Sequence, residues 1–227
     1  MSKWPRIVVP GLPHHVTHRG TRRQTVFFEA QDYQKYKSLL REACGQYDVE
    51  IWAYCLMPNH VHLIAAPRTE QSLSQAIGRC HQRYAKMINA RFDWRGHLWE
   101  QRFSSIPMDE KHLLMAAQYV ELNPVRANLS ITPGYYSWSS ARSHLTGTQD
   151  DLAVSSLLQE LVCDWPSFLA AGLRQRHIDK FRELEKTGYP AADEPFLKQL
   201  EAQVGRLLRP KKRGPKQKSL ISRLSRN

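Results

Sequence analysis

The segment from Val49 to Ala66 restricts the possible folds of this chain more than any other part of the sequence. Val49 to Met57 and His60 to Ala66 are apolar runs that favour strands, and Pro58-Asn59 separates them. This pattern predicts a β-hairpin. Helical spacing flanks the hairpin, at Tyr33, Tyr36, Leu40, Ala43 and Tyr47 before it and at Leu73, Ala76, Ile77, Cys80, Tyr84 and Met87 after it.

Three further segments complete the order of elements. His14 to Arg19 predicts a first strand and Arg102 to Met108 a fourth. Asp109 is a suitable N-cap for a helix that must end near Asn123, because Pro124 disfavours the helical conformation of the preceding residue. The order predicts an α+β fold, a ferredoxin-like split βαββαβ antiparallel sheet with an added helix. The first and third strands are central in that sheet.

The chain is expected to have three parts. Residues 1–147 hold the sheet and its helices, and residues 148–205 have a wholly helical pattern that predicts an accessory module. Residues 206–227 are strongly basic, contain no acidic residue and include prolines and a glycine. Such a segment cannot bury a core, which predicts a flexible basic tail.

The charge balance indicates a polyanionic partner. The chain has 33 Lys and Arg against 21 Asp and Glu, a net charge of +12, which attracts nucleic acid. We find no apolar run of the roughly 20 residues needed to cross a bilayer. We therefore expect a cytoplasmic, nucleoid-associated protein with no membrane contact and no small-molecule organic cofactor. The cysteines form no C-x-x-C pair, so reduced thiols are expected.

A pair of histidines alternates along the third predicted strand. His60 and His62 project from the same face, where two neutral imidazoles can share a divalent cation. The alternative is a half-exposed pair satisfied by hydroxyls or water. Chemistry on phosphate would favour Mg²⁺ or Mn²⁺ and require a further oxygen ligand. A histidine-triad hydrolase would need a third histidine at Ile64, so we exclude that class.

The last predicted helix of the sheet domain carries a tyrosine and an amide on one face. Tyr119 and Asn123 are four residues apart and therefore lie one above the other. Together they offer a phenol and a carbonyl oxygen. Alternatively, Tyr119 is an aromatic at the edge of the core and Asn123 merely ends the helix before Pro124.

Four stretches of sequence resemble the single-tyrosine HUH transposases, and among these the REP-associated tyrosine transposases are the closer match. The resemblance covers roughly residues 5 to 145. The matching stretches are His14 to Gly20, Met57 to Leu63, Tyr119 to Ala127 and Trp138 to Ala141.

The resemblance implies roles for individual residues. His60 and His62 would bind the metal, Tyr119 would be the nucleophile, and a polar residue one turn later would complete the site. Asn123 fills that position, where insertion-sequence relatives typically carry Gln. Glu121 is a weaker candidate because it points to nearly the opposite side of the helix. The implied activity is cutting and rejoining of single-stranded or hairpin-forming DNA through a 5'-phosphotyrosine.

Basic residues outside the motifs are candidates for contact with DNA phosphates. We expect a monomer, with a dimer as the alternative, because the helical module has no counterpart in the minimal insertion-sequence enzymes. The candidates are Arg19, Arg22, Arg23 and Arg126 near the site and Lys211, Lys212, Arg213, Lys216 and Lys218 in the tail.

Two rival functions remain open from the sequence. A DNA-binding regulator that descends from a transposase would keep the fold without activity. A metal-dependent phosphodiesterase that activates water would not depend on Tyr119.

Overall fold

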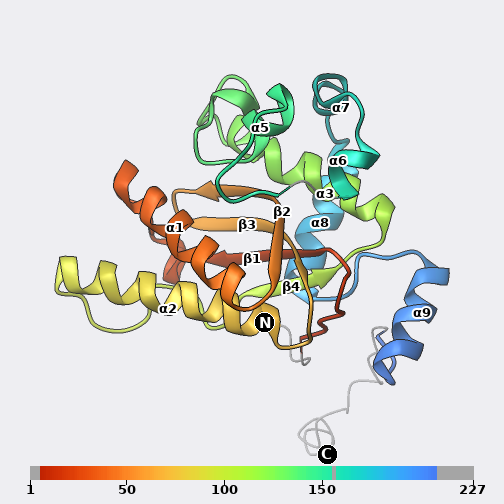
Figure 1. Cartoon of the computed structure of the whole chain (residues 1–227), viewed down its shortest axis with the longest axis horizontal. Coiled ribbons are helices and arrows are strands. Elements are labelled where there is room, and N and C mark those ends of the chain that lie inside the picture. The colour runs from red at the N-terminus through yellow and green to blue at the C-terminus, as the bar shows by residue number, and fades with distance from the viewer. Residues whose placement is uncertain (1–5, 155–156, 209–227) are drawn as a thin grey trace, which may run out of the picture.

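The computed structural model describes residues 6–154 and 157–208 and has an antiparallel sheet at its centre (Figure 1). Its strands are β1 (His14–Arg19), β2 (Val49–Met57), β3 (His60–Pro67) and β4 (Ser104–Pro107). Their spatial order is β2-β3-β1-β4, so β1 and β3 are central. The predicted α+β fold and its split βαββαβ topology are confirmed.

The two faces of the sheet are covered by different helices (Figure 1). Helices α1 (Ala30–Gln46) and α2 (Ser72–Phe92) pack on one face, and α3 (Glu110–Glu121) packs on the other. Alternation along β3 divides its side chains accordingly, because Val61 and Leu63 belong to the first core and Ile64 to the second.

Helix α3 begins and ends close to the predicted positions. The Asp109 carboxylate accepts a hydrogen bond from the backbone N–H of His112 at 2.8 Å, which caps the helix. The helix ends at Glu121, and a short helix α4 (Asn123–Arg126) follows with Pro124 in its first turn, where proline is tolerated. Strand β4 is shorter than the predicted Arg102 to Met108.

All but the last of the described C-terminal helices pack on the α3 face, and the last packs against Ile7 and Val9. The C-terminal helices are α6 (Leu157–Leu161), α7 (Trp165–Ala171), α8 (Gln175–Thr187) and α9 (Glu194–Val204), and the short elements before them are η1 (Thr21–Arg23), η2 (Pro133–Tyr135) and α5 (Ala141–Thr146). Leu158, Trp165, Ile178 and Phe181 share one hydrophobic cluster with α3. No helix among the described residues is both long and apolar enough to cross a membrane.

Helix α8 is held beside the sheet by polar contacts as well as by its apolar face. Lys180 Nζ lies 3.0 Å from Nε2 of His112, whose Nδ1 lies 2.7 Å from the Asp109 carboxylate. After α8 the chain pairs with the end of β4, where the backbone N–H of Ala191 donates to the carbonyl of Pro107 at 3.0 Å. These contacts fix one side of α8 over the strands that carry the histidines.

Candidate active site

The paired histidines lie at the beginning of β3, on the face that α3 covers. In the register with β1, His60 is opposite Arg19 and His62 is opposite Thr17. The two imidazole ring centres are 4.8 Å apart. His62 is buried, whereas His60 is half-buried. The expected common orientation of the two side chains is therefore present.

Tyr119 lies against this pair. Its ring centre is 5.5 Å from that of His62, and the residue is only 5% exposed. The Arg126 guanidinium carbon lies 4.4 Å from the centre of the phenol ring. Burial raises the pKa of the Tyr119 phenol, and Glu185 raises it further, whereas Arg126 and Arg182 lower it. The acidic and basic neighbours of the phenol therefore have opposite effects on its pKa.

Asn123 is engaged with Arg126. Its side-chain oxygen accepts a hydrogen bond from Nη2 of Arg126 at 2.7 Å, and its buried Nδ2 has no hydrogen-bond partner among the described residues. Glu121 points elsewhere, as its position on the helix indicates, and accepts a hydrogen bond from Ser140 at 2.7 Å. The roles of Tyr119, Asn123 and the histidine pair in catalysis and metal binding remain predictions.

Two residues that the sequence did not single out complete the cluster. His15 of β1 stacks on His62 with ring centres 5.3 Å apart, and its Nε2 lies 3.1 Å from Nδ1 of His62. Glu185 of α8 places Oε1 3.6 Å from Nδ1 of His62 and 4.0 Å from Nε2 of His15. Strand alternation could have indicated His15, because it shares a face with Thr17 and Arg19. No spacing in the sequence indicates Glu185.

Burial controls the protonation of these groups. It lowers the pKa of His15 to about 3, and burial together with Arg19 lowers the pKa of His60 to about 4. The pKa of His62 is well below its ordinary value, mainly through burial. The imidazoles are therefore neutral near pH 7, which is the form that binds metal. Burial also raises the pKa of Glu185 to about 7, against the opposing effects of nearby arginines.

The imidazoles of His15 and His62 and the carboxylate of Glu185 are side chains that can bind a divalent metal. Imidazole nitrogens and a carboxylate are common ligands of divalent transition metals. Glu185 Oε1 is buried and has no hydrogen-bond partner among the described residues. A ligand atom without a protein partner is the arrangement expected of a group that receives an ion.

Phe181 covers the tyrosine from α8. Its ring stacks on the Tyr119 ring at 5.5 Å between centres, and it also contacts the edge of the His15 ring at 6.0 Å. Helix α8 therefore contributes three residues to the site, namely Phe181, Arg182 and Glu185. The sequence predicted the helical segment but not its position over Tyr119.

The predicted arginines lie around this site. Arg19 is next to His60 across the β1–β3 pairing. Arg22 and Arg23 are exposed and adopt left-handed backbone conformations, with φ of 56° and 62°. The carbonyl of Arg23 accepts a hydrogen bond from Asn59, the residue before His60. Contact of these arginines with DNA stays a prediction, and Lys211, Lys212, Arg213, Lys216 and Lys218 lie outside the described residues.

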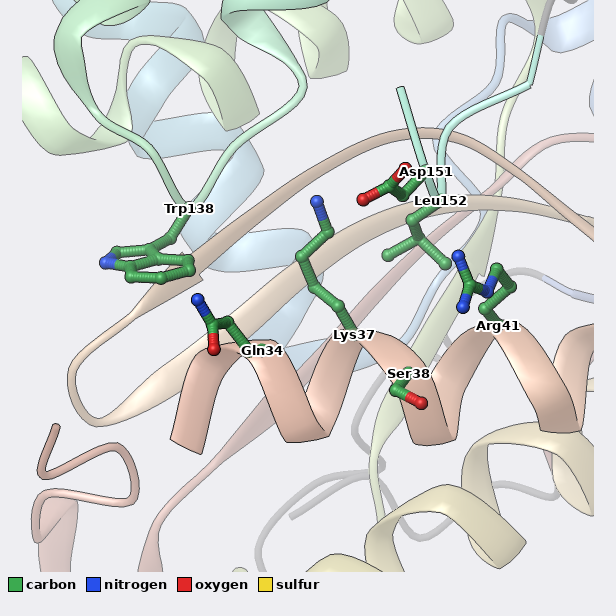
Figure 2. A pocket seen from close by; sticks show the side chains of 7 residues that line it. All are labelled: Gln34, Lys37, Ser38, Arg41, Trp138, Asp151 and Leu152. Atoms are coloured by element: carbon green, nitrogen blue, oxygen red, sulfur yellow. The ribbon is translucent and has the colours of Figure 1, made fainter. Parts of the chain in front are cut away.

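A separate hollow of about 260 Å³ lies on the α1 side of the molecule (Figure 2). Lys37 extends from α1 between Trp138 and Asp151 in this view. Its ammonium lies 3.8 Å from the carboxylate of Asp150. The hollow contains none of the histidines, so we do not assign the chemistry to it.

The fold of this chain has a counterpart among solved structures. The sheet matches in architecture a solved structure described as "Structure of the REP associates tyrosine transposase bound to a REP hairpin", with a TM-score of 0.56 and 17% identity over 69% of this chain and 93% of that one. A putative transposase from Deinococcus radiodurans R1 is similar at 22% identity over 52% of this chain and 95% of that one, with a TM-score of 0.38.

The particular family follows from the sequence itself. Residues 8–123, slightly more than half of the chain, match the family model described as "Transposase IS200 like". This chain belongs to the IS200-like transposase family. No protein with a curated description matches it.

Proposed function

We propose that this protein cuts and rejoins single-stranded DNA, with Tyr119 as nucleophile and His60 and His62 as ligands of Mg²⁺ or Mn²⁺. The observation that carries the proposal is the position of the Tyr119 ring beside that of His62, 5.5 Å between centres. Asn123 is the proposed third ligand. Its side-chain oxygen would bind the ion after it loses its hydrogen bond from Arg126.

The proposed step is a transesterification. The Tyr119 oxygen loses its proton to solvent and attacks the scissile phosphorus, which forms a 5'-phosphotyrosine as the bond to the 3' oxygen breaks. That oxygen takes up a proton and becomes a free 3'-hydroxyl. A 3'-hydroxyl of another strand reverses the step and rejoins the DNA. A bound divalent ion supplies Lewis-acid polarisation of a non-bridging phosphate oxygen.

The charged groups of this chain support the same chemistry. Arg126 and Arg182 both act to lower the pKa of the Tyr119 phenol and thus favour its anionic form. Arg19, Arg22 and Arg23 are proposed to hold the flanking phosphates, since they lie beside or before the histidine strand. The DNA strand reaches the phenol once the Phe181 side chain moves off the ring, because the two rings are stacked.

The proposed substrate is a hairpin-forming DNA with a single-stranded flank. The solved structure of similar fold is described as bound to a REP hairpin, which makes a palindromic element the first DNA to try. We expect a monomer to suffice, because His62, Tyr119 and the surrounding arginines all come from one chain.

The test uses a 3'-labelled hairpin oligonucleotide, since a 5'-phosphotyrosine retains the 3' fragment, with the full-length protein and Mg²⁺ or Mn²⁺, followed by denaturing electrophoresis. We expect a covalent protein–DNA adduct from the wild type and none from Tyr119→Phe. Tyr135→Phe is the matched control, since Tyr135 is 80% exposed, and it should form the adduct as the wild type does. Cleavage without any adduct, equal in wild type and Tyr119→Phe, would instead favour a phosphodiesterase that uses water.

A further inference from the structure

Three exposed aromatic side chains meet near the end of helix α2 and the beginning of helix α1, which lie on the same side of the molecule (Figure 1). Phe28, Phe92 and Trp94 are 39%, 39% and 40% exposed. Their ring centres are 4.7 Å apart between Phe28 and Phe92, 4.8 Å between Phe92 and Trp94 and 5.7 Å between Phe28 and Trp94. We call these three rings the aromatic patch. A contiguous exposed apolar patch marks an interaction surface.

The aromatic patch is held in place by a neighbouring arginine. The Arg91 guanidinium carbon lies 4.7 Å from the centre of the Phe92 ring and 5.7 Å from that of Phe28. Its Nη1 and Nη2 each donate to the Asp32 carboxylate at 2.8 Å. Asp32 is buried and also accepts a hydrogen bond from the backbone N–H of Phe28 at 2.8 Å. The rings are therefore ordered before a ligand arrives, which lowers the entropic cost of binding.

The aromatic patch is tied to the turn that leads into the histidine strand. The backbone N–H groups of Val26 and Phe27 donate to the carbonyl of Pro58 at 2.8 and 3.1 Å. Phe28 follows Phe27 directly, and Pro58 is two residues before His60. This path keeps the Cα atoms of Phe28 and His60 less than about 20 Å apart, a distance that a few nucleotides of single strand span.

Positive charge lies on both loops that adjoin the rings. The loop after β1 runs beside the loop after α2, because the backbone N–H of Thr21 donates to the carbonyl of Leu98 at 2.9 Å. The exposed arginines of these loops are Arg22, Arg23 and Arg95. Of the acidic residues adjacent in sequence to the rings, Glu29 already pairs with Arg91 at 2.6 Å, whereas Asp93 opposes phosphate. The net positive charge favours a nucleic acid over an apolar protein surface as the occupant.

We infer that the aromatic patch stacks unpaired bases in the single-stranded flank of the DNA substrate. The inference rests on the proposed function and names a binding surface outside the Tyr119 site. Every base presents a flat face to an aromatic ring, so such stacking tolerates many sequences. The arginines hold the phosphates between the stacked bases, and the Pro58-Asn59 turn leads the strand toward His60. The rings position the DNA and take no part in the transesterification.

The test is fluorescence anisotropy of the full-length protein with a labelled hairpin alone and with the same hairpin carrying a single-stranded flank, both in chelator. The wild type should bind the flanked DNA more tightly. Trp94→Ala should weaken binding of the flanked DNA roughly fivefold or more, the effect of one lost stack, and leave the hairpin alone unchanged. Trp94→Phe keeps a ring and should retain most of the affinity. Tyr135→Ala removes an 80% exposed ring outside the aromatic patch and should match the wild type on both DNAs.

Photochemical cross-linking locates the flank directly. A flank with a single 5-iodouracil, irradiated on the folded protein and mapped by mass spectrometry, should attach to Phe28, Phe92 or Trp94. Melting temperatures establish that the variants are folded. Attachment elsewhere, or equal binding of the flanked DNA by the wild type and Trp94→Ala, would overturn the inference. So would a dimer of the wild type that Trp94→Ala abolishes, because it would assign the aromatic patch to self-association.

These outcomes are independent of the cleavage chemistry. Chelator prevents metal-dependent cleavage, and Tyr119→Phe should bind and cross-link the flanked DNA as the wild type does. Binding that depends on Trp94 without any Tyr119 adduct would contradict the proposed function alone. An adduct on Tyr119 with binding that ignores Trp94 would contradict the base-stacking surface alone.

Discussion

At the scale of single residues, a second histidine pair lies on the opposite face of the sheet. His18 and His81 face each other with their Nδ1 atoms 2.7 Å apart, and Nε2 of His81 lies 2.7 Å from the Tyr36 hydroxyl. Trp99 stacks on both rings. The pair is enclosed between α2, α1 and β1 and thus serves the core.

This pair makes stability depend on pH. Burial lowers the pKa of His18 from 6.5 to about 4, although the Glu100 carbonyl opposes the shift, and burial holds the pKa of His81 well below its ordinary value. The unfolded chain therefore takes up these protons first. The contribution to stability is full above about pH 6.5 and is lost as the pH falls from there through about 4.

We expect the melting temperature of the wild type to fall between pH 7 and pH 5 more than that of His81→Gln. The variant keeps a polar side chain but removes one buried titrating group. His97→Gln, at an exposed position, should behave as the wild type does. Equal falls in the wild type and His81→Gln would contradict this account of the buried pair.

Local spacing could reveal only part of the candidate site. His60 and His62 are two residues apart and Tyr119 and Asn123 four, so strand and helix periodicity alone place each pair on one face. Their meeting required the topology, which the order of elements predicted. Strand alternation could also have indicated the face of His15, whereas Glu185 could not be found in this way, because its position depends on the docking of α8.

At the scale of elements, the turn after β1 depends on a glycine. A Cβ on Gly20 would lie 2.4 Å from the Gln24 carbonyl oxygen and 2.7 Å from Cγ1 of Val26. The backbone N–H of Gly20 donates to the carbonyl of Asn59 at 2.8 Å, which ties this turn to the histidine strand. The close approach of backbone, rather than an unusual φ, requires glycine here.

We expect Gly20→Ala to destabilise the fold by about 1 to 3 kcal/mol, as overpacked sites do. Gly78→Ala is the matched control in the exposed middle of α2, where a Cβ meets no atom within 4 Å. It should stabilise the protein by about 0.5 to 1 kcal/mol through higher helix propensity. Urea unfolding measures both changes, and a neutral Gly20→Ala would show that the turn relaxes without cost.

Elements with strong periodicity could be predicted well, and their packing partners could not. The hairpin and the helices around it follow from apolar spacing, and Asp109 and Pro124 placed the ends of α3 to within a few residues. Strand β4 is only Ser104–Pro107 because pairing with β1, not composition, decides its length. The C-terminal helices were expected, but the cluster they share with α3 has no signature in the sequence.

At the scale of the whole molecule, excess positive charge should govern DNA binding. The net charge of +12 predicts strong salt dependence, and the segment 206–227 contributes basic residues without any acidic one. Deletion of residues 206–227 should weaken binding to all sequences alike and flatten the plot of log affinity against log salt concentration. Fluorescence anisotropy with hairpin and scrambled DNA measures both, and an unchanged slope would contradict a role for this segment.

The central claim is that the Tyr119 phenol and the β3 histidines act on one phosphate. Peptide mapping by mass spectrometry of the protein trapped on cleaved hairpin DNA tests it most directly. The account predicts a nucleotide remnant on Tyr119 in the wild type, and its loss in His62→Ala under conditions where that variant still binds the DNA. A remnant on any other residue, or undiminished labelling of Tyr119 in His62→Ala, would contradict it.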